Sequence, residues 1–104
     1  YCTTWGNPNI DNIKRICDQL KGKGIKYLIM DSGWYGAPYI WADSVGDWEE
    51  SACSRLQGQL LELADRVRKA GMKFGLWFEL ERAAAGARFV KENPQHYIFE
   101  HNNY

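Results

Sequence analysis

The feature that most constrains the fold of this chain is the near-continuous apolar run Ile25–Met30, which polar residues follow at once. Such a run is typical of a strand that is covered on both faces of a parallel sheet. A second run over residues 73–80 has the same character and also ends among acids. Because parallel strands need a long crossover connection between them, the sequence predicts an α/β fold.

Amphipathic segments separate these runs. Apolar residues recur at helical spacing over residues 10–20 and again over residues 60–70, and glycines follow both segments. A third helix is expected over residues 83–93, where Pro94 ends it. The short aromatic and Thr-rich segment 1–5 is expected to be a strand, so the predicted order is β-α-β-α-β-α.

The overall charge excludes several classes of partner. The chain has 104 residues, and its 13 Lys and Arg balance 13 Asp and Glu. It therefore offers no basic surface for nucleic acid and no charge asymmetry for an anionic membrane. No apolar run is long enough to span a bilayer, and no basic-then-apolar leader opens the chain. The predicted partner is a small molecule.

The cysteines indicate in which cellular compartment the protein is expected. Cys2, Cys17 and Cys53 have no metal-ligand spacing, and an odd number in so short a chain argues against a disulfide framework. Free thiols favour a reducing, cytoplasmic location. The start at Tyr1 without Met leads us to expect that the chain was cut from a longer protein.

Acids and aromatics gather where the two apolar runs end. Asp31 and Ser32 follow the first run, while Trp77, Glu79 and Glu81 share one face of the second. That face is expected to point into a barrel, and the opposite apolar face of residues 74–80 is expected to pack on helices. Site residues of parallel α/β barrels lie at the carboxyl ends of the strands.

This combination suits a carbohydrate. Five of the residues are Trp, and aromatics make up 14% of the chain. The CH faces of a sugar pack on indole rings, while carboxylates accept hydrogen bonds from its hydroxyls. For Asp31 a ligand role is the favoured interpretation. For Glu79 and Glu81 an internal ion pair with Lys or Arg is the alternative, because a buried acid needs a partner.

Four segments in order resemble the melibiase-type α-galactosidases of glycoside hydrolase family 36. They are residues 3–5 (Thr-Thr-Trp), 31–36 (Asp-Ser-Gly-Trp-Tyr-Gly), 46–48 (Gly-Asp-Trp) and 71–81 (Gly-Met-Lys-Phe-Gly-Leu-Trp-Phe-Glu-Leu-Glu). The resemblance implies a (β/α)8 TIM barrel, of which residues 1–104 would be the first three βα units. It also implies hydrolysis of terminal α-galactosides with retention, with no metal and no cofactor.

The resemblance assigns roles position by position. Asp31 matches the first of two adjacent family acids that bind galactose hydroxyls, and Ser32 stands where the second acid is expected. A neutral hydrogen bond there is weaker than a charge-assisted one, which points to a different preferred sugar. Together with the acids and aromatics that follow the two apolar runs, these matches predict a substrate site that comprises Trp5, Asp31, Ser32, Trp34, Trp48, Trp77 and Glu79.

Catalysis is expected to lie elsewhere. Retaining hydrolysis needs two carboxyl groups on opposite sides of the scissile bond, and the family takes both from later strands. Glu79 and Glu81 project side by side from one strand face, which does not suit that geometry. We therefore expect no catalytic residue on this chain. A non-catalytic carbohydrate-binding piece is the alternative, and self-association through open sheet edges is expected of the isolated chain.

Overall fold

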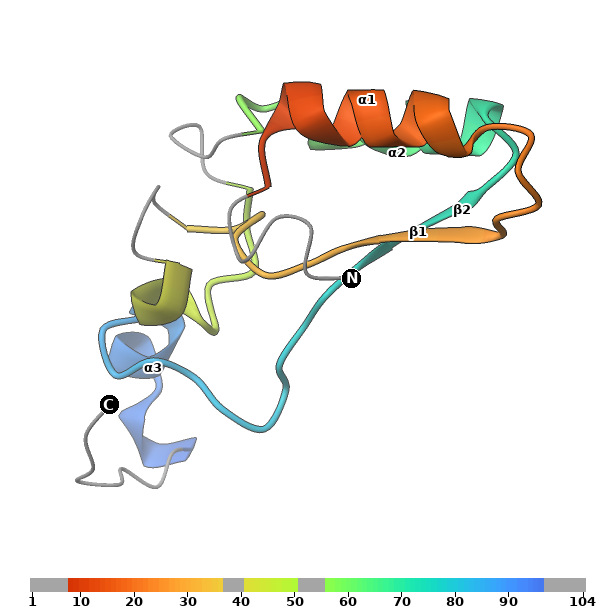
Figure 1. Ribbon diagram of the computed structural model, residues 1–104. Helices are drawn as coiled ribbons and strands as arrows, with labels where there is room; N and C mark the ends of the chain where they lie inside the picture. The colour runs from red at the N-terminus through yellow and green to blue at the C-terminus, as the bar shows by residue number, and fades with distance from the viewer. Residues whose placement is uncertain (1–7, 37–40, 51–55, 97–104) are drawn as a thin grey trace.

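The structure is a computed structural model that describes residues 8–36, 41–50 and 56–96. The strand expected over residues 1–5, with Trp5 in it, lies outside the described residues. Figure 1 shows the order of the elements. They are α1 (Ile10–Leu20), β1 (Tyr27–Met30), the 3₁₀ helix η1 (Trp41–Ser44), α2 (Leu60–Lys69), β2 (Lys73–Leu76), α3 (Arg88–Glu92) and the 3₁₀ helix η2 (Pro94–His96).

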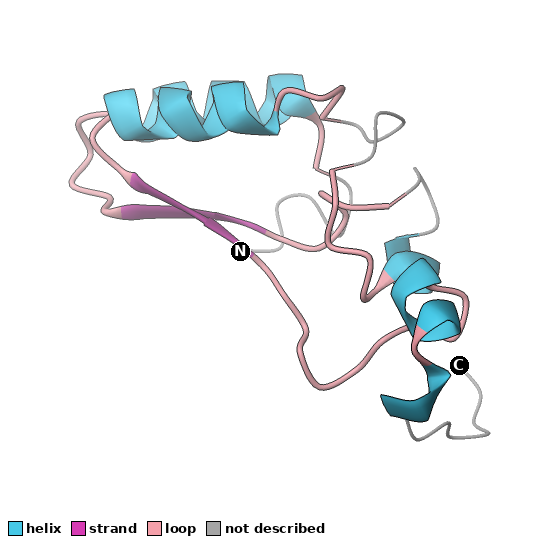
Figure 2. Cartoon of the chain, turned by 180° about the vertical axis from the view of Figure 1, so that it is seen from behind, coloured by secondary structure: helices cyan, strands magenta, loops and turns pink. Residues whose placement is uncertain are grey.

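The centre of the fold is a parallel pair of strands. β1 and β2 pair in the register Tyr27↔Lys73 through Met30↔Leu76. Helices α1 and α2 lie side by side on one face of this pair, as both views show (Figures 1 and 2). The predicted order α-β-α-β is therefore confirmed over residues 10–76, and the described chain is a small α/β unit.

Burial on β1 alternates in this chain, whereas the apolar run predicted a strand covered on both faces. Leu28 and Met30 point toward the helices and are buried, whereas Tyr27 and Ile29 are 59% and 66% exposed. Large apolar side chains are therefore exposed on the face of the strand pair that points away from the helices. The predicted self-association of the isolated chain stays a prediction.

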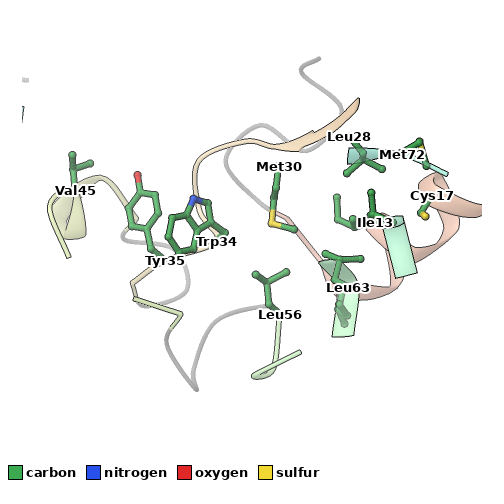
Figure 3. Close-up of a cluster of buried hydrophobic side chains, with 12 residues drawn as sticks. Ile13, Cys17, Leu28, Met30, Trp34, Tyr35, Val45, Leu56, Leu63 and Met72 are labelled. Carbon is green, nitrogen blue, oxygen red and sulfur yellow. The ribbon is translucent and has the colours of Figure 1, made fainter. Parts of the chain in front are cut away.

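The two long helices are fixed to each other and to the sheet. Asn9 caps α1, since its Oδ1 accepts from the backbone N–H groups of Asp11 and Asn12 at 3.0 and 3.3 Å. Between the helices, Lys14 Nζ lies 2.9 Å from Glu62 Oε1. Apolar side chains fill the space beneath (Figure 3). This cluster comprises Ile10, Ile13, Cys17, Leu28, Met30, Trp34, Tyr35, Val45, Leu56, Leu63, Val67 and Met72.

The strand predicted over residues 73–80 ends at Leu76. The Trp77 N–H still donates to the Met30 carbonyl at 2.8 Å, but the Trp77 carbonyl accepts from the indole Nε1 of Trp34 at 2.9 Å. This side-chain bond diverts the chain from the sheet. Phe78 and Leu80 are consequently exposed, and the prediction that they pack on helices was wrong.

The helix predicted over residues 83–93 is shorter than expected, because α3 covers only Arg88–Glu92. The Ala84 N–H donates to the Val45 carbonyl at 2.8 Å, and the Ala87 N–H closes a turn onto the Ala84 carbonyl. These bonds hold the preceding alanines against residues 45–46 and not in a helix. Among the described residues no helix combines the length and the apolar character needed to cross a membrane.

Candidate functional site

The carboxyl ends of β1 and β2 bring the predicted residues of the two runs together. Because Met30 pairs with Leu76, Asp31 and Trp77 follow at the same edge of the sheet. The N–H bond from Trp77 to Met30 keeps the two chains adjacent at this point. The predicted grouping of an acid and an indole at one edge is present in the structure.

A tight turn holds Asp31 at this edge. Its Oδ1 accepts from the backbone N–H of Ser32 at 2.8 Å, and its side chain is half-buried. Gly33 follows with φ +97°, a backbone conformation that side chains disfavour. Ser32 itself is buried, at 7% exposure.

Five aromatic rings pack beside this turn. Trp48 makes most of the contacts, with ring centroids 4.7 Å from Tyr35, 5.1 Å from Phe78 and 6.2 Å from both Trp34 and Trp77. Tyr35 also stacks on Trp77 at 6.4 Å with an interplanar angle of 14°. The rings therefore form one cluster drawn from three separate segments of the chain.

The cluster has a buried back and an open front. Trp34 is 3% exposed and its indole N–H is already used by the Trp77 carbonyl, so it supports the other rings from behind. Trp48 and Trp77 are half-buried. Of the aromatic residues assigned to the site from the sequence and described here, these two have ring surface left for a ligand.

Glu79 has the partner that the ion-pair alternative required. Its Oε1 lies 3.7 Å from Arg82 Nε, with both side chains partly exposed. Such a pair in water is weak and breaks readily, so it leaves the carboxylate available to a hydroxyl. Glu81 is exposed and does not belong to the group of side chains at the carboxyl ends of β1 and β2.

Tyr35 is a member of the cluster that sequence reasoning missed. It is fully buried, and its hydroxyl has no hydrogen-bond partner among the residues that the structure describes. Burial, with help from the negative charges of Glu79 and Asp31, raises the pKa of Tyr35 to about 12. The position directly after the Asp-Ser-Gly-Trp turn was the available signal. The buried phenol therefore stays a neutral donor near two carboxylates.

Among the described residues no group of three or more His, Cys, Asp or Glu side chains is arranged to hold a metal ion. Cys17 is a buried free thiol within the helical core, where burial raises its pKa. Trp5, the remaining residue assigned from the sequence, lies outside the described residues.

The fold and the site define an α/β piece with an acid-and-aromatic edge, and comparison with known proteins identifies its family. The melibiase family model matches residues 3–104, so the chain belongs to the melibiase family.

Curated relatives agree with this family. An α-galactosidase of Lactobacillus acidophilus is 34% identical over 93 residues, which are 89% of this chain and 13% of that protein. The bifunctional α-galactosidase/sucrose kinase AgaSK of Mediterraneibacter gnavus is 34% identical over 84 residues, or 81% of this chain and 9% of that protein. The chain thus spans about a tenth of the length of the curated relatives it matches.

Solved structures agree as well. The galactosidase domain of AgaSK superposes with a TM-score of 0.74 at 32% identity, covering 88% of this chain and 13% of that one. The family 36 α-galactosidase AgaB of Geobacillus stearothermophilus also gives 0.74, at 26% identity over 97% of this chain and 14% of its own.

Proposed function

We propose that residues 1–104 form the first three βα units of the (β/α)8 catalytic barrel of a retaining glycoside hydrolase that acts on terminal α-galactosides. The relatives named above are α-galactosidases, and their similarity supports this activity. Under this proposal the nucleophile and the acid/base come from later strands. The chain described here supplies one side of the sugar pocket.

The observation that carries the proposal is the edge where Asp31 and Trp77 meet. A half-buried carboxylate lies there beside partly open indole rings, in a cluster with the half-buried Trp48. A pyranose needs both contacts at once, an apolar face for its CH groups and acceptors for its hydroxyls. We assign the hydroxyl contacts to Asp31, Ser32 and Glu79, and the stacking contacts to Trp5, Trp48 and Trp77.

Trp34 takes a supporting part in this proposal. Its burial and its bond to the Trp77 carbonyl fix the backbone that carries the stacking ring. Ser32 takes a place where the resembled enzymes have a second acid. A hydroxyl can donate as well as accept, which suits a sugar whose substituent at that position is itself an acceptor.

Asp31 gives the decisive experiment, done in the full-length protein with an aryl α-galactoside. Asp31→Ala should raise KM and lower kcat together, because hydroxyl anchoring also orients the ring for attack. Loss of charge-assisted hydrogen bonds predicts a fall in kcat/KM of about 10- to 100-fold. Asp31→Asn should be milder. Asp65→Ala, on the exposed face of α2, is the matched control and should leave kcat/KM unchanged.

The outcome separates the two interpretations of the site. A full-length protein that binds galactose but does not hydrolyse the aryl galactoside would favour the non-catalytic carbohydrate-binding alternative. An Asp31→Ala variant with normal kcat/KM and a lowered melting temperature would make Asp31 structural and would overturn the site assignment.

A further inference from the structure

Trp48 contacts more rings of the aromatic cluster than any other described side chain, yet no regular element carries it. It lies in the segment 45–50 that follows η1, between two strands to which it is not paired. A stacking ring on an unsupported segment would lose much of its effect, because the ring must be held in place before the sugar arrives. The bonds that hold this segment therefore matter.

One set of bonds fixes Asp47 to α3. The Asp47 Oδ2 accepts from the Arg88 N–H at 2.9 Å, and the Asp47 Oδ1 accepts from the Phe89 N–H at 3.1 Å. These are the first two amides of the helix, which have no partner within the helix. The residue at the N-cap is Ala87, whose side chain cannot cap. An acid about forty residues away in the sequence does so.

A second bond fixes Glu50 to α2. Both carboxylate oxygens of Glu50 lie 3.2 Å from the N–H of Leu60, the first residue of that helix. Its N-cap residue Gln59 makes no side-chain capping bond. Acids are favoured at both places because the amino end of a helix carries partial positive charge.

Backbone packing also holds the segment 45–50 in place. Gly46 has φ +110°, and a Cβ there would lie 3.0 Å from the Cβ of Ala83. Next to it the Ala84 N–H donates to the Val45 carbonyl. The segment that carries Trp48 is thus pressed against residues 83–87 on one side and bonded to α2 on the other.

We propose that Asp47 and Glu50 are positioning residues that hold Trp48 in the sugar site by anchoring its segment to the amino ends of α3 and α2. Neither carboxylate touches the substrate. Each binds helix amides, and Trp48 lies between them in the sequence. This assignment rests on the proposed function, since it takes Trp48 to be a wall of the sugar pocket.

The test uses the full-length protein and the variants Asp47→Asn and Glu50→Gln, which keep the shape of each side chain. Asp47→Asn places an NH₂ donor opposite one of the two helix amides from which the carboxylate accepts. Glu50→Gln keeps one neutral oxygen for the single Leu60 N–H and loses the charge of the acceptor. We expect KM for an aryl α-galactoside to rise about tenfold in Asp47→Asn and by less in Glu50→Gln, with a smaller change in kcat. The double variant should rise further.

Glu49→Gln is the matched control. Glu49 neighbours both Trp48 and Glu50, but its Oε1 pairs with the Arg88 side chain at 2.6 Å on an exposed surface. Losing that exposed pair should leave KM unchanged. If Glu49→Gln raises KM as much as Asp47→Asn does, the exposed pair with the Arg88 side chain holds the segment as well as the bonds to the helix amides do, and the proposal that these amide bonds position Trp48 falls.

Near-UV circular dichroism separates this proposal from the proposed function. If the segment loses its anchor, Trp48 moves relative to its neighbours and the aromatic signal of Asp47→Asn changes. That change is expected even in a protein that cleaves no galactoside, in which case the proposed function fails and the anchoring stands. Unchanged dichroism together with unchanged KM, in both Asp47→Asn and Glu50→Gln, would overturn the anchoring.

Discussion

Helix α1 and the pair α2 and α3 begin in different ways, and the difference separates two regions of the molecule. Asn9 caps α1 from the adjacent position in the sequence. Helices α2 and α3 instead receive their caps from the distant acids Glu50 and Asp47. The first kind of cap is a local property of the sequence, while the second exists only after the chain has folded.

The same division runs through the rest of the molecule. Residues 10–30 and 60–76 form a scaffold in which periodic apolar side chains pack two helices on two strands. Residues 31–36, 41–50 and 77–96 form a site region with little regular structure, held by side chains bonded to backbone groups far away in sequence. The scaffold is stabilised by burial of many similar groups, the site region by a few specific bonds.

The largest expected effect tests the scaffold. The side chain of Leu63, which belongs to α2, is fully buried. Leu63→Ala therefore leaves a cavity and should lower the free energy of unfolding by about 2–5 kcal/mol. Leu61 on the same helix is 81% exposed, and Leu61→Ala should change the free energy of unfolding by less than about 0.5 kcal/mol. A urea titration measures both. Equal losses would mean that α2 packs through a different face.

The two regions also differ in how far the sequence could predict them. Helices over 10–20 and 60–70 were predicted nearly to the residue, because their apolar spacing and the glycines after them are local signals. The grouping of Asp31 with Trp77 followed from the parallel order of the strands. Both predictions needed only periodicity and topology.

Periodicity and topology did not predict the structure of the site region. The strand after Lys73 was predicted four residues too long, because the bond from the Trp34 indole to the Trp77 carbonyl has no local signature. The third helix was predicted too long, since Ala84 is a good helix former that is bonded to Val45 instead. The buried phenol of Tyr35 was missed because one aromatic after a turn does not reveal whether it has a partner.

The next largest effect is expected at that indole bond. Trp34→Phe keeps a buried ring but leaves the Trp77 carbonyl without its donor, which should cost about 1–3 kcal/mol of unfolding free energy. Binding of galactose should weaken as well, because the backbone of Trp77 loses its anchor. Calorimetric melting and galactose titration check the two effects. If Trp34→Phe lowers the stability but leaves the affinity for galactose unchanged, Trp34 contributes to core packing and not to the sugar site.

A gain in stability is expected at Tyr35. Tyr35→Phe removes a buried hydroxyl that lacks a partner, so the free energy of unfolding should rise by about 1 kcal/mol at neutral pH. A loss of stability in this variant would show that the hydroxyl is bonded in solution.

The pH dependence of that variant sharpens the test. The folded pKa of Tyr35 is about 12 and the usual value is 10.0, so between these values the unfolded chain releases a proton that the folded chain keeps. Stability from this group is complete below pH 10 and is lost as the pH rises toward 12. Tyr35→Phe should therefore lose less stability than the parent over this interval. Identical losses in the two proteins would contradict the shifted pKa.

The smallest effect is expected where the scaffold uses charge. Lys14 joins α1 to α2 through Glu62 and through the side-chain oxygen of Gln59, each at 2.9 Å. Lys14→Met keeps the apolar stem and should cost about 0.5–1 kcal/mol, less at high salt. Arg68→Met breaks only a pair within α2, with Asp65, and should cost less still. If both variants lose equally, the bond between the helices adds nothing, and burial alone holds the scaffold together.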